Sequence, residues 1–172
     1  MTGNRVSEIC ADTSTFLPDR VLDEDANILF RFKDGGKGAM TISQVATGEE
    51  NNLRLRAYAS EGAVQWEQEN PNYLDVYRYG QPRETLTRAH AEYLSEAAAR
   101  ATRVPTGHPE GYLEAFANIY CDAAEAIRRH IDGRPMPADE YAFPTVHDGL
   151  RGVRFIQAAV ESSNAGGQWT AL

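Results

Sequence analysis

This sequence contains few cysteines and few lysines. Its two cysteines, Cys10 and Cys121, lie far apart and form no CxxC pair, so we expect two reduced, buried thiols and no disulfide framework. The two lysines, Lys33 and Lys37, flank the turn segment DGG at residues 34–36. Neither lysine is placed like a buried catalytic amine.

Long apolar runs and an excess of basic residues are also absent. No apolar stretch approaches the roughly 20 residues that span a bilayer, and MTGNRVSEIC lacks the features of a signal peptide. The 25 acidic and 17 basic residues give a formal charge of −8, which opposes binding to nucleic acid and to anionic lipid. We therefore expect a cytoplasmic protein with neither nucleic-acid nor membrane partners.

The motifs of several large enzyme classes are missing. The sequence has no GxSxG, HExxH, P-loop or GxGxxG motif, and its GGKG at residues 35–38 lies where a hairpin turn is predicted. The four histidines, His90, His108, His130 and His147, show no metal-ligand spacing. We expect this chain to bind neither a metal nor a cofactor.

The first half of the sequence is rich in short extended runs. Apolar residues alternate with polar ones in Ile28–Phe32 and again from Met40 to Gln44, with a glycine-rich turn between them, which predicts a β-hairpin. Short loops between successive runs favour antiparallel pairing. The six predicted strands fall within residues 5–16, 27–32, 40–44, 53–59, 64–69 and 74–79.

The second half changes to a helical period. Apolar residues recur at spacings of three and four from Pro109 to Ile131 and from Thr145 to Val160, where TVHD fits a capping box and NAGG ends the helix. A shorter helix is predicted around residues 91–102. Strands followed by helices predict a single α+β domain over residues 1–172, with helices on one face of an open, mostly antiparallel sheet.

Some predicted strands carry apolar residues on both faces. Leu29 lies opposite Ile28, and Leu74, Val76 and Tyr77 leave no purely polar side. A second apolar face is usually buried by another subunit or domain, which predicts a homodimer through the sheet. The alternative is that these are ordinary scattered surface aromatics.

The segment GHPEGY places His108 before Pro109, which is suited to the first position of a helix, so His108 is predicted to be its N-cap. The positive end of the helix dipole would favour a neutral imidazole, able to donate and accept hydrogen bonds with a hydroxyl of a sugar or polyol. Glu110 would offer a carboxylate nearby. The alternative is that His108 only caps the helix or packs on Tyr112.

Three segments together carry a family resemblance: residues 28–74 (ILFRF through NPNYL), residues 107–120 (GHPEGYLEAFANIY) and residues 144–169 (PTVHDG through GGQW). In order and spacing they resemble the C-terminal domain of the Gfo/Idh/MocA oxidoreductases, the family of glucose-fructose oxidoreductase and inositol dehydrogenase. The resemblance implies a dihydrodipicolinate-reductase-like α+β domain. Its open sheet would form a substrate wall and the subunit interface of a dimer or tetramer.

The resemblance also implies that cofactor binding and catalysis belong to a different domain from this one. In the family, NAD or NADP and the catalytic lysine of an EKP-type motif belong to an N-terminal Rossmann domain, and this sequence contains neither that motif nor that domain. No catalytic residue is therefore assigned here, and we expect the chain to be part of a larger dehydrogenase. By its match to the family pattern, His108 is the best substrate contact, with Glu110, Tyr112 and Gln44 as weaker candidates.

Two other hypotheses stay open at this stage. A stand-alone, non-catalytic domain for oligomerisation or small-ligand binding would keep the same fold. A hydrolase using His108 and Glu110 is a weaker alternative, because the sequence offers no recognisable nucleophile.

Overall fold

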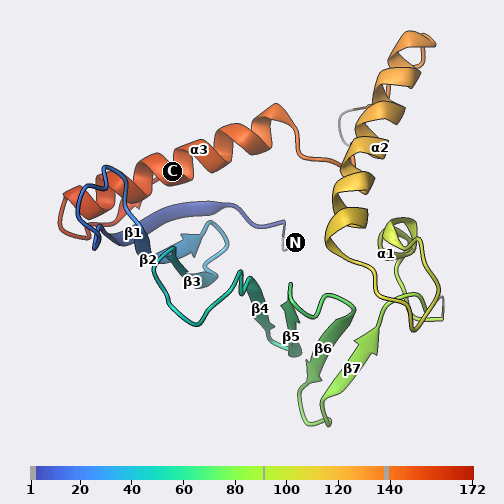
Figure 1. Ribbon diagram of the computed structural model, residues 1–172, viewed down its shortest axis with the longest axis horizontal. Coiled ribbons are helices and arrows are strands. Elements are labelled where there is room, and N and C mark those ends of the chain that lie inside the picture. The colour runs from blue at the N-terminus through green and yellow to red at the C-terminus, as the bar shows by residue number, and fades with distance from the viewer. Residues whose placement is uncertain (1–2, 91, 138–139) are drawn as a thin grey trace. The chain divides into compact units, whose positions relative to one another are not determined.

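The computed structural model describes residues 3–90, 92–137 and 140–172 (Figure 1). The chain divides into two compact units, one made of Met1–Gly48 with Pro144–Leu172 and the other of Glu49–Phe143. Each unit has its own four-stranded antiparallel sheet. The predicted α+β class with antiparallel pairing is confirmed.

The first unit is a sheet covered by one long helix. Its strands are β1 (Val6–Ser14), β2 (Asp25–Phe32), β3 (Lys37–Ser43) and the short β8 (Thr170–Ala171), in the order β3-β2-β1-β8. Helix α3 (Val146–Asn164) packs along β1 (Figure 1). The predicted hairpin is confirmed, since β2 and β3 pair across a turn in which Gly35 has a φ of 91°.

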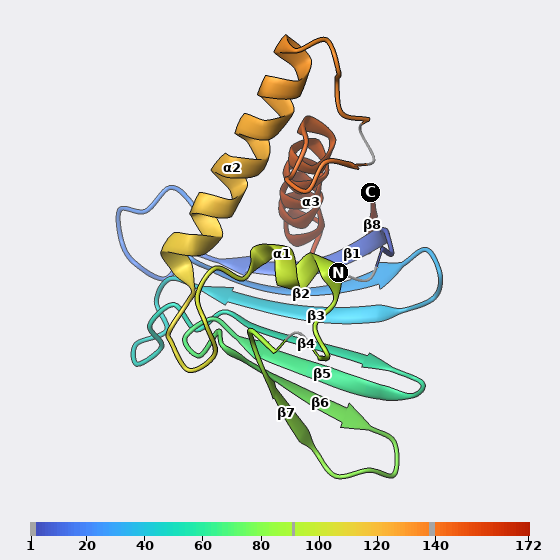
Figure 2. The same cartoon turned by 90° about the vertical axis from the view of Figure 1, so that its right-hand side faces the viewer.

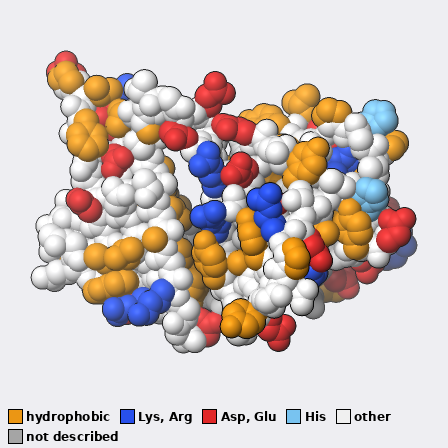
Figure 3. Space-filling view, turned by 90° about the horizontal axis from the view of Figure 1, so that it is seen from below, with side chains coloured by type: hydrophobic (Ala, Val, Ile, Leu, Met, Phe, Trp, Pro, Cys, Tyr) orange, Lys and Arg blue, Asp and Glu red, His pale blue; other side chains and the backbone are white. Residues whose placement is uncertain are grey.

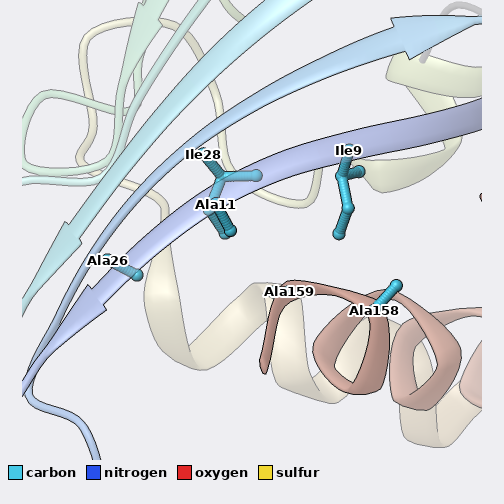
Figure 4. Packing of buried hydrophobic residues seen from close by; sticks show 6 residues of the cluster. All are labelled: Ile9, Ala11, Ala26, Ile28, Ala158 and Ala159. Atoms are coloured by element: carbon cyan, nitrogen blue, oxygen red, sulfur yellow. The ribbon is translucent and has the colours of Figure 1, made fainter. Parts of the chain in front are cut away.

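The core of the first unit lies between the sheet and α3 (Figure 4). Alternate residues of β1 and β2 point towards the helix, as period-2 side-chain direction requires. Four of the six buried core residues are alanines, so the helix backbone can approach the strands closely. The core consists of Ile9, Ala11, Ala26, Ile28, Ala158 and Ala159. The rings of Phe30 and Phe155 meet edge to face at its margin, with centroids 6.5 Å apart.

Serine side chains of α3 complete the outer edge of β1. Strand β8 pairs only with Glu8 and Ile9, so the next main-chain donors of β1 need other partners. The Ala11 N–H donates to Ser162 Oγ at 2.9 Å, and Ser162 Oγ donates in turn to Gln168 O at 2.6 Å. Since Ser162 is fully buried, this hydroxyl replaces a strand partner that water could not supply.

The ends of α3 follow the sequence prediction. The Asp148 carboxylate accepts from the Thr145 N–H at 2.7 Å and from the Thr145 hydroxyl at 2.8 Å, as the TVHD spacing suggested. The helix ends at Asn164, after which Gly166 and Gly167 adopt positive φ. The predicted helix is confirmed at both ends.

The second unit combines a sheet with two helices. Its strands are β4 (Arg54–Ala59), β5 (Gly62–Glu67), β6 (Tyr73–Arg78) and β7 (Glu84–Thr87), paired in chain order (Figure 2). The short strands β7 and β8 have no counterpart among the predicted runs.

Helix α1 (Glu96–Ala101) is shorter than the helix predicted around residues 91–102, of which residue 91 lies outside the described residues. It lies against α2 (Tyr112–Ile131), where Arg100 forms an ion pair with Asp122 at 2.5 Å. Within the described residues, no helix is long and apolar enough to cross a membrane.

Both faces of the second sheet carry large side chains. The strand register places an apolar set on one face, made of Leu55, Val64, Trp66, Leu74, Val76 and Leu86. Tyr58, Tyr73 and Tyr77 occupy the opposite face together with charged residues. None of these side chains is fully buried within the chain. On the face drawn in Figure 3, exposed hydrophobic side chains occur in groups rather than singly.

The two cysteines differ in their surroundings. Both are free, but only Cys10 is partly buried, and its thiol donates to Gly167 O at 3.1 Å. Cys121 is exposed on α2, so the prediction that both thiols are buried is wrong for this residue. The Cys121 position falls on the polar side of an amphipathic helix, where the Arg103 guanidinium approaches its sulfur at 3.4 Å.

Candidate functional site

A small cavity lies in the second unit, where strands β6 and β7 reach the same end of the sheet. The last paired residues there are Tyr73 and Thr87, and the chain continues from them to Asn72 and Arg88. The cavity has a volume of about 220 Å³. It is lined by Asn72, Tyr73, Thr87, Arg88, Thr106, Gly107, His108 and Pro109. This volume is below the roughly 300–1,000 Å³ of typical drug-sized pockets, so the cavity suits one small molecule.

Arg88 connects this end of the sheet to the loop of residues 103–111. The Arg88 side chain is only 17% exposed, and all three guanidinium nitrogens donate hydrogen bonds. Nε donates to Asn72 Oδ1 at 2.6 Å, Nη1 donates to Val104 O at 2.8 Å, and Nη2 donates to Pro105 O at 3.2 Å and to His108 O. Arg88 therefore holds the loop through three main-chain carbonyl groups.

Glu110 is the buried partner of Arg88. Its carboxylate lies 2.5 Å from Arg88 Nη1 and accepts from the main-chain N–H groups of Arg103, at 2.6 Å, and Val104, at 3.4 Å. The Glu110 side chain is 6% exposed and is not part of the cavity lining. The sequence suggested a carboxylate offered to substrate, whereas the structure uses both oxygens inside the protein. Because the charges of Arg88 and Glu110 cancel, this pair adds no net charge to the cavity wall.

His108 lines the cavity, but it does not cap the helix. Helix α2 begins at Tyr112 with Gly111 as its N-cap, so the predictions that His108 is the N-cap and that Pro109 opens the helix are wrong. The helix start is fixed by Glu114, whose carboxylate accepts from the Gly111 N–H at 3.0 Å. The argument that the helix dipole keeps the imidazole neutral therefore fails as well.

The geometry of His108 comes from a turn. The His108 N–H donates to Pro105 O at 3.3 Å, and Gly107 adopts a φ of 83°, a conformation that favours glycine at this position of a turn. His108 Nδ1 lies 3.3 Å from Thr106 O, which fits a proton on Nδ1. Among the described residues Nε2 has no hydrogen-bond partner, so this nitrogen is available to a ligand hydroxyl.

Two of the three weaker candidates, Tyr112 and Gln44, lie elsewhere. The Tyr112 side chain is 66% exposed, outside the cavity lining, and its ring packs on Phe116 with centroids 5.1 Å apart. Gln44 follows β3 in the first unit, is exposed, and donates its main-chain N–H to Glu24 O at 2.8 Å. The structure therefore brings His108 into the cavity, with Glu110 behind it, and places neither Tyr112 nor Gln44 there.

Arg88 and Asn72 were missed by the sequence interpretation. Asn72 Oδ1 accepts from Arg88 Nε and also from the Glu110 N–H, at 3.2 Å. Asn72, which precedes β6, therefore binds both Arg88, which follows β7, and the loop of residues 103–111. No local pattern marks either residue, because their proximity depends on the pairing of β6 with the unpredicted strand β7. Glu114 did leave a signal, since its spacing from Gly111 is that of a capping box.

The described residues do not fit a metal or a dinucleotide. No group of three or more His, Cys, Asp or Glu side chains in these ranges is placed to hold a metal ion. Gly35 and Gly36 lie in the turn between β2 and β3, and Gly38 lies within β3, so none of them precedes a helix whose N-terminus could face a pyrophosphate.

The helix start beside the cavity should respond to acid through Glu114. Its pKa is lowered from the ordinary value of 4.5, first by the hydrogen bond from the Gly111 N–H. A lowered pKa means that the carboxylate stabilises the folded state fully above pH 4.5, and that this contribution is lost as the pH falls through the lower folded-state value. We expect the protection factors of the amides at residues 111–115, which are corrected for the intrinsic pH dependence of exchange, to fall over that range. Glu114→Gln should abolish this pH dependence of the protection factors, and equal profiles of protection factor against pH for the two proteins would contradict the assignment.

Comparison with known proteins shows which family the chain resembles. The family model for the GFO/IDH/MocA C-terminal domain matches residues 1–65. An oxidoreductase of Bacillus subtilis, YfiI, is 30% identical over 166 residues, which is 96% of this chain and 42% of that protein. The chain is similar to the C-terminal domain of this oxidoreductase family. The resemblance seen in the sequence is thereby confirmed.

Solved structures of oxidoreductases share this GFO/IDH/MocA C-terminal fold. An oxidoreductase from Sinorhizobium meliloti is 44% identical, with a TM-score of 0.90 over 98% of this chain and 47% of that one. An inositol dehydrogenase homolog from Azotobacter vinelandii, complexed with NADH and myo-inositol, is 29% identical, with a TM-score of 0.93 over 99% of this chain and 45% of that one. The chain thus spans less than half the length of these relatives.

Proposed function

We propose that this chain is the C-terminal, substrate-binding part of a cytoplasmic oxidoreductase that uses NAD or NADP and acts on a sugar, an inositol or a related polyol. Both units, residues 1–172, would belong to one domain of that enzyme. The cofactor and the residues that carry out the chemistry would lie outside this chain, consistent with the poor fit of the described residues to a dinucleotide.

The observation that carries the proposal is the cavity with His108 on its wall. It presents His108 Nε2, which has no partner in the part of the chain that the structure describes, the hydroxyls of Thr87 and Thr106 and the amide of Asn72. These groups can donate to or accept from hydroxyl groups. The Arg88–Glu110 pair contributes no net charge, which suits an uncharged polyol better than a sugar acid or phosphate. Orienting such a molecule towards a cofactor is the main task of a substrate wall. The myo-inositol bound by the Azotobacter vinelandii homolog supports the same substrate class.

We further propose that the enzyme assembles as a dimer or tetramer through its sheets. The support is that large apolar or aromatic side chains occur on both faces of the second sheet, and that Leu29 is 51% exposed on the face of the first sheet opposite α3. Exposed apolar groups of this kind are commonly buried by a second subunit.

The test uses the full-length gene product with a panel of inositols, hexoses and linear polyols, each with NAD and with NADP. We expect the appearance of reduced nicotinamide with at least one of them, and sedimentation as a dimer or larger species. A full-length protein that reduces neither cofactor with any member of the panel would refute the proposed activity. A dimer that binds a polyol without turnover would instead favour the non-catalytic alternative.

In that enzyme, His108→Ala should raise KM for the polyol about tenfold, since one hydrogen bond to a ligand hydroxyl contributes on the order of 1.4 kcal/mol. His130→Ala, at the end of α2, provides the matched control and should leave KM unchanged. An unchanged KM in His108→Ala would remove this residue from the substrate site.

A further inference from the structure

We infer that Arg88 is a positioning residue of the proposed polyol site, fixing the main chain of residues 104–108 so that the His108 ring stays at the cavity wall. The inference rests on the proposed function. It concerns a residue that need not touch the substrate through its guanidinium, because its donors are directed at protein acceptors.

The first support is the number and direction of these bonds. A guanidinium has five N–H donors in a rigid planar fork. Here its contacts reach Asn72 before β6, three main-chain carbonyls of the loop, and the Glu110 carboxylate. One carbonyl belongs to His108 itself, so the bond acts directly on the residue that faces the cavity.

The second support is how few other bonds hold this loop. Within the described residues, the bonds from segment 104–108 to the rest of the protein, apart from those of Arg88, are Thr106 Oγ1 to Ala89 O at 3.0 Å and Val104 N–H to Glu110. The remaining bonds, from His108 N–H to Pro105 O and between the His108 ring and Thr106 O, lie inside the segment. Without Arg88, the turn would keep its internal shape but lose most of its attachment.

The third support is that a lysine at position 88 could not make the same set of hydrogen bonds. A lysine at position 88 would keep the charge and could pair with Glu110, but its single ammonium cannot reach Asn72 and the loop carbonyls at the same time. Arg88→Lys therefore separates the charge of this residue from its geometry. Arg78→Lys makes the same chemical change on the same sheet, where the guanidinium pairs with Glu84 at the exposed surface.

The experiment uses the full-length enzyme with Arg88→Lys and Arg78→Lys, and myo-inositol as the first probe, followed by whichever polyol the activity panel identifies. For Arg88→Lys we expect KM for the polyol to rise at least tenfold, kcat to change less than threefold, and KM for the nicotinamide cofactor to stay constant. Amide exchange at residues 104–108 should accelerate in the absence of substrate. Arg78→Lys should match the wild type in all four measurements.

Other outcomes decide against the inference. An unchanged polyol KM with unchanged exchange at residues 104–108 would overturn it, and so would a fall in kcat with both KM values constant, because that pattern indicates a catalytic or purely structural effect. If Arg88→Lys does not fold, Thr106→Val removes the bond from Thr106 Oγ1 to Ala89 O, and amide exchange at residues 104–108 without substrate should accelerate, which the loss of a substrate contact alone would not cause. If no polyol is turned over by the wild type, the proposed function fails, while exchange at residues 104–108 still shows whether Arg88 positions the loop.

Discussion

Replacing Glu110 by alanine should lower the free energy of unfolding of the second unit by about 3–5 kcal/mol. The variant leaves the Arg88 guanidinium, which is 17% exposed, without its carboxylate partner, and removes the acceptor of two main-chain N–H groups. A buried charge that loses its partner retains the cost of desolvation without the compensating attraction. The effect should therefore exceed that of any ion pair on the surface of the same unit.

Two variants make this result specific. Glu110→Gln keeps the shape and one acceptor oxygen and should cost less, about 1–3 kcal/mol. Glu84→Ala breaks the exposed pair with Arg78, whose side chains are 51% and 55% exposed, and should change stability by less than about 1 kcal/mol. Urea unfolding followed by Trp66 fluorescence in a Trp169→Phe background reports on the second unit alone. A Glu110→Ala protein within about 1 kcal/mol of its parent would show that the pair is not buried in solution.

Local sequence patterns correctly predicted those elements whose ends are set by residues close to them in the sequence. The β2–β3 hairpin and both ends of α3 follow from glycine turns and from the spacing of Thr145 and Asp148, and each was found as predicted. The start of α2 shows the limit of the same reasoning. Pro109 could open a helix, but the Glu114 carboxylate binds the Gly111 N–H, and α2 begins at Tyr112. The sequence would have located this start only if the proline and the Gly111–Glu114 spacing had been weighed against each other.

The candidate site was only partly predictable, because its parts meet through tertiary pairing. His108 was found from its segment, whereas Arg88 comes from the end of β7, a four-residue strand without a clear alternating pattern. Their contact crosses 20 positions of sequence. Glu110 was recognised as a carboxylate near His108, but its burial against Arg88 could not be derived without that strand. Sequence located the loop, and tertiary structure assigned the roles within it.

Ile9→Ala should be the most damaging change in the first unit, with a loss of about 2–5 kcal/mol in its free energy of unfolding. Ile9 is fully buried, and in a core of six residues only Ile9 and Ile28 have large side chains. The four alanines around them cannot move into the space that a missing Ile9 side chain leaves. A loss of this size is comparable to the whole stability of a small unit.

Leu29→Ala is the matched control on the neighbouring strand. Leu29 pairs with Cys10 across the strands, so it lies on the face opposite Ile9, and it is 51% exposed. Its truncation should change the stability of the isolated chain by less than about 0.5 kcal/mol. Trp169 fluorescence in a Trp66→Phe background follows the first unit during denaturation. Equal losses for the two variants would mean that the face carrying Leu29 is buried in the isolated chain, by self-association through the sheet, and sedimentation of the same samples would then reveal the dimer.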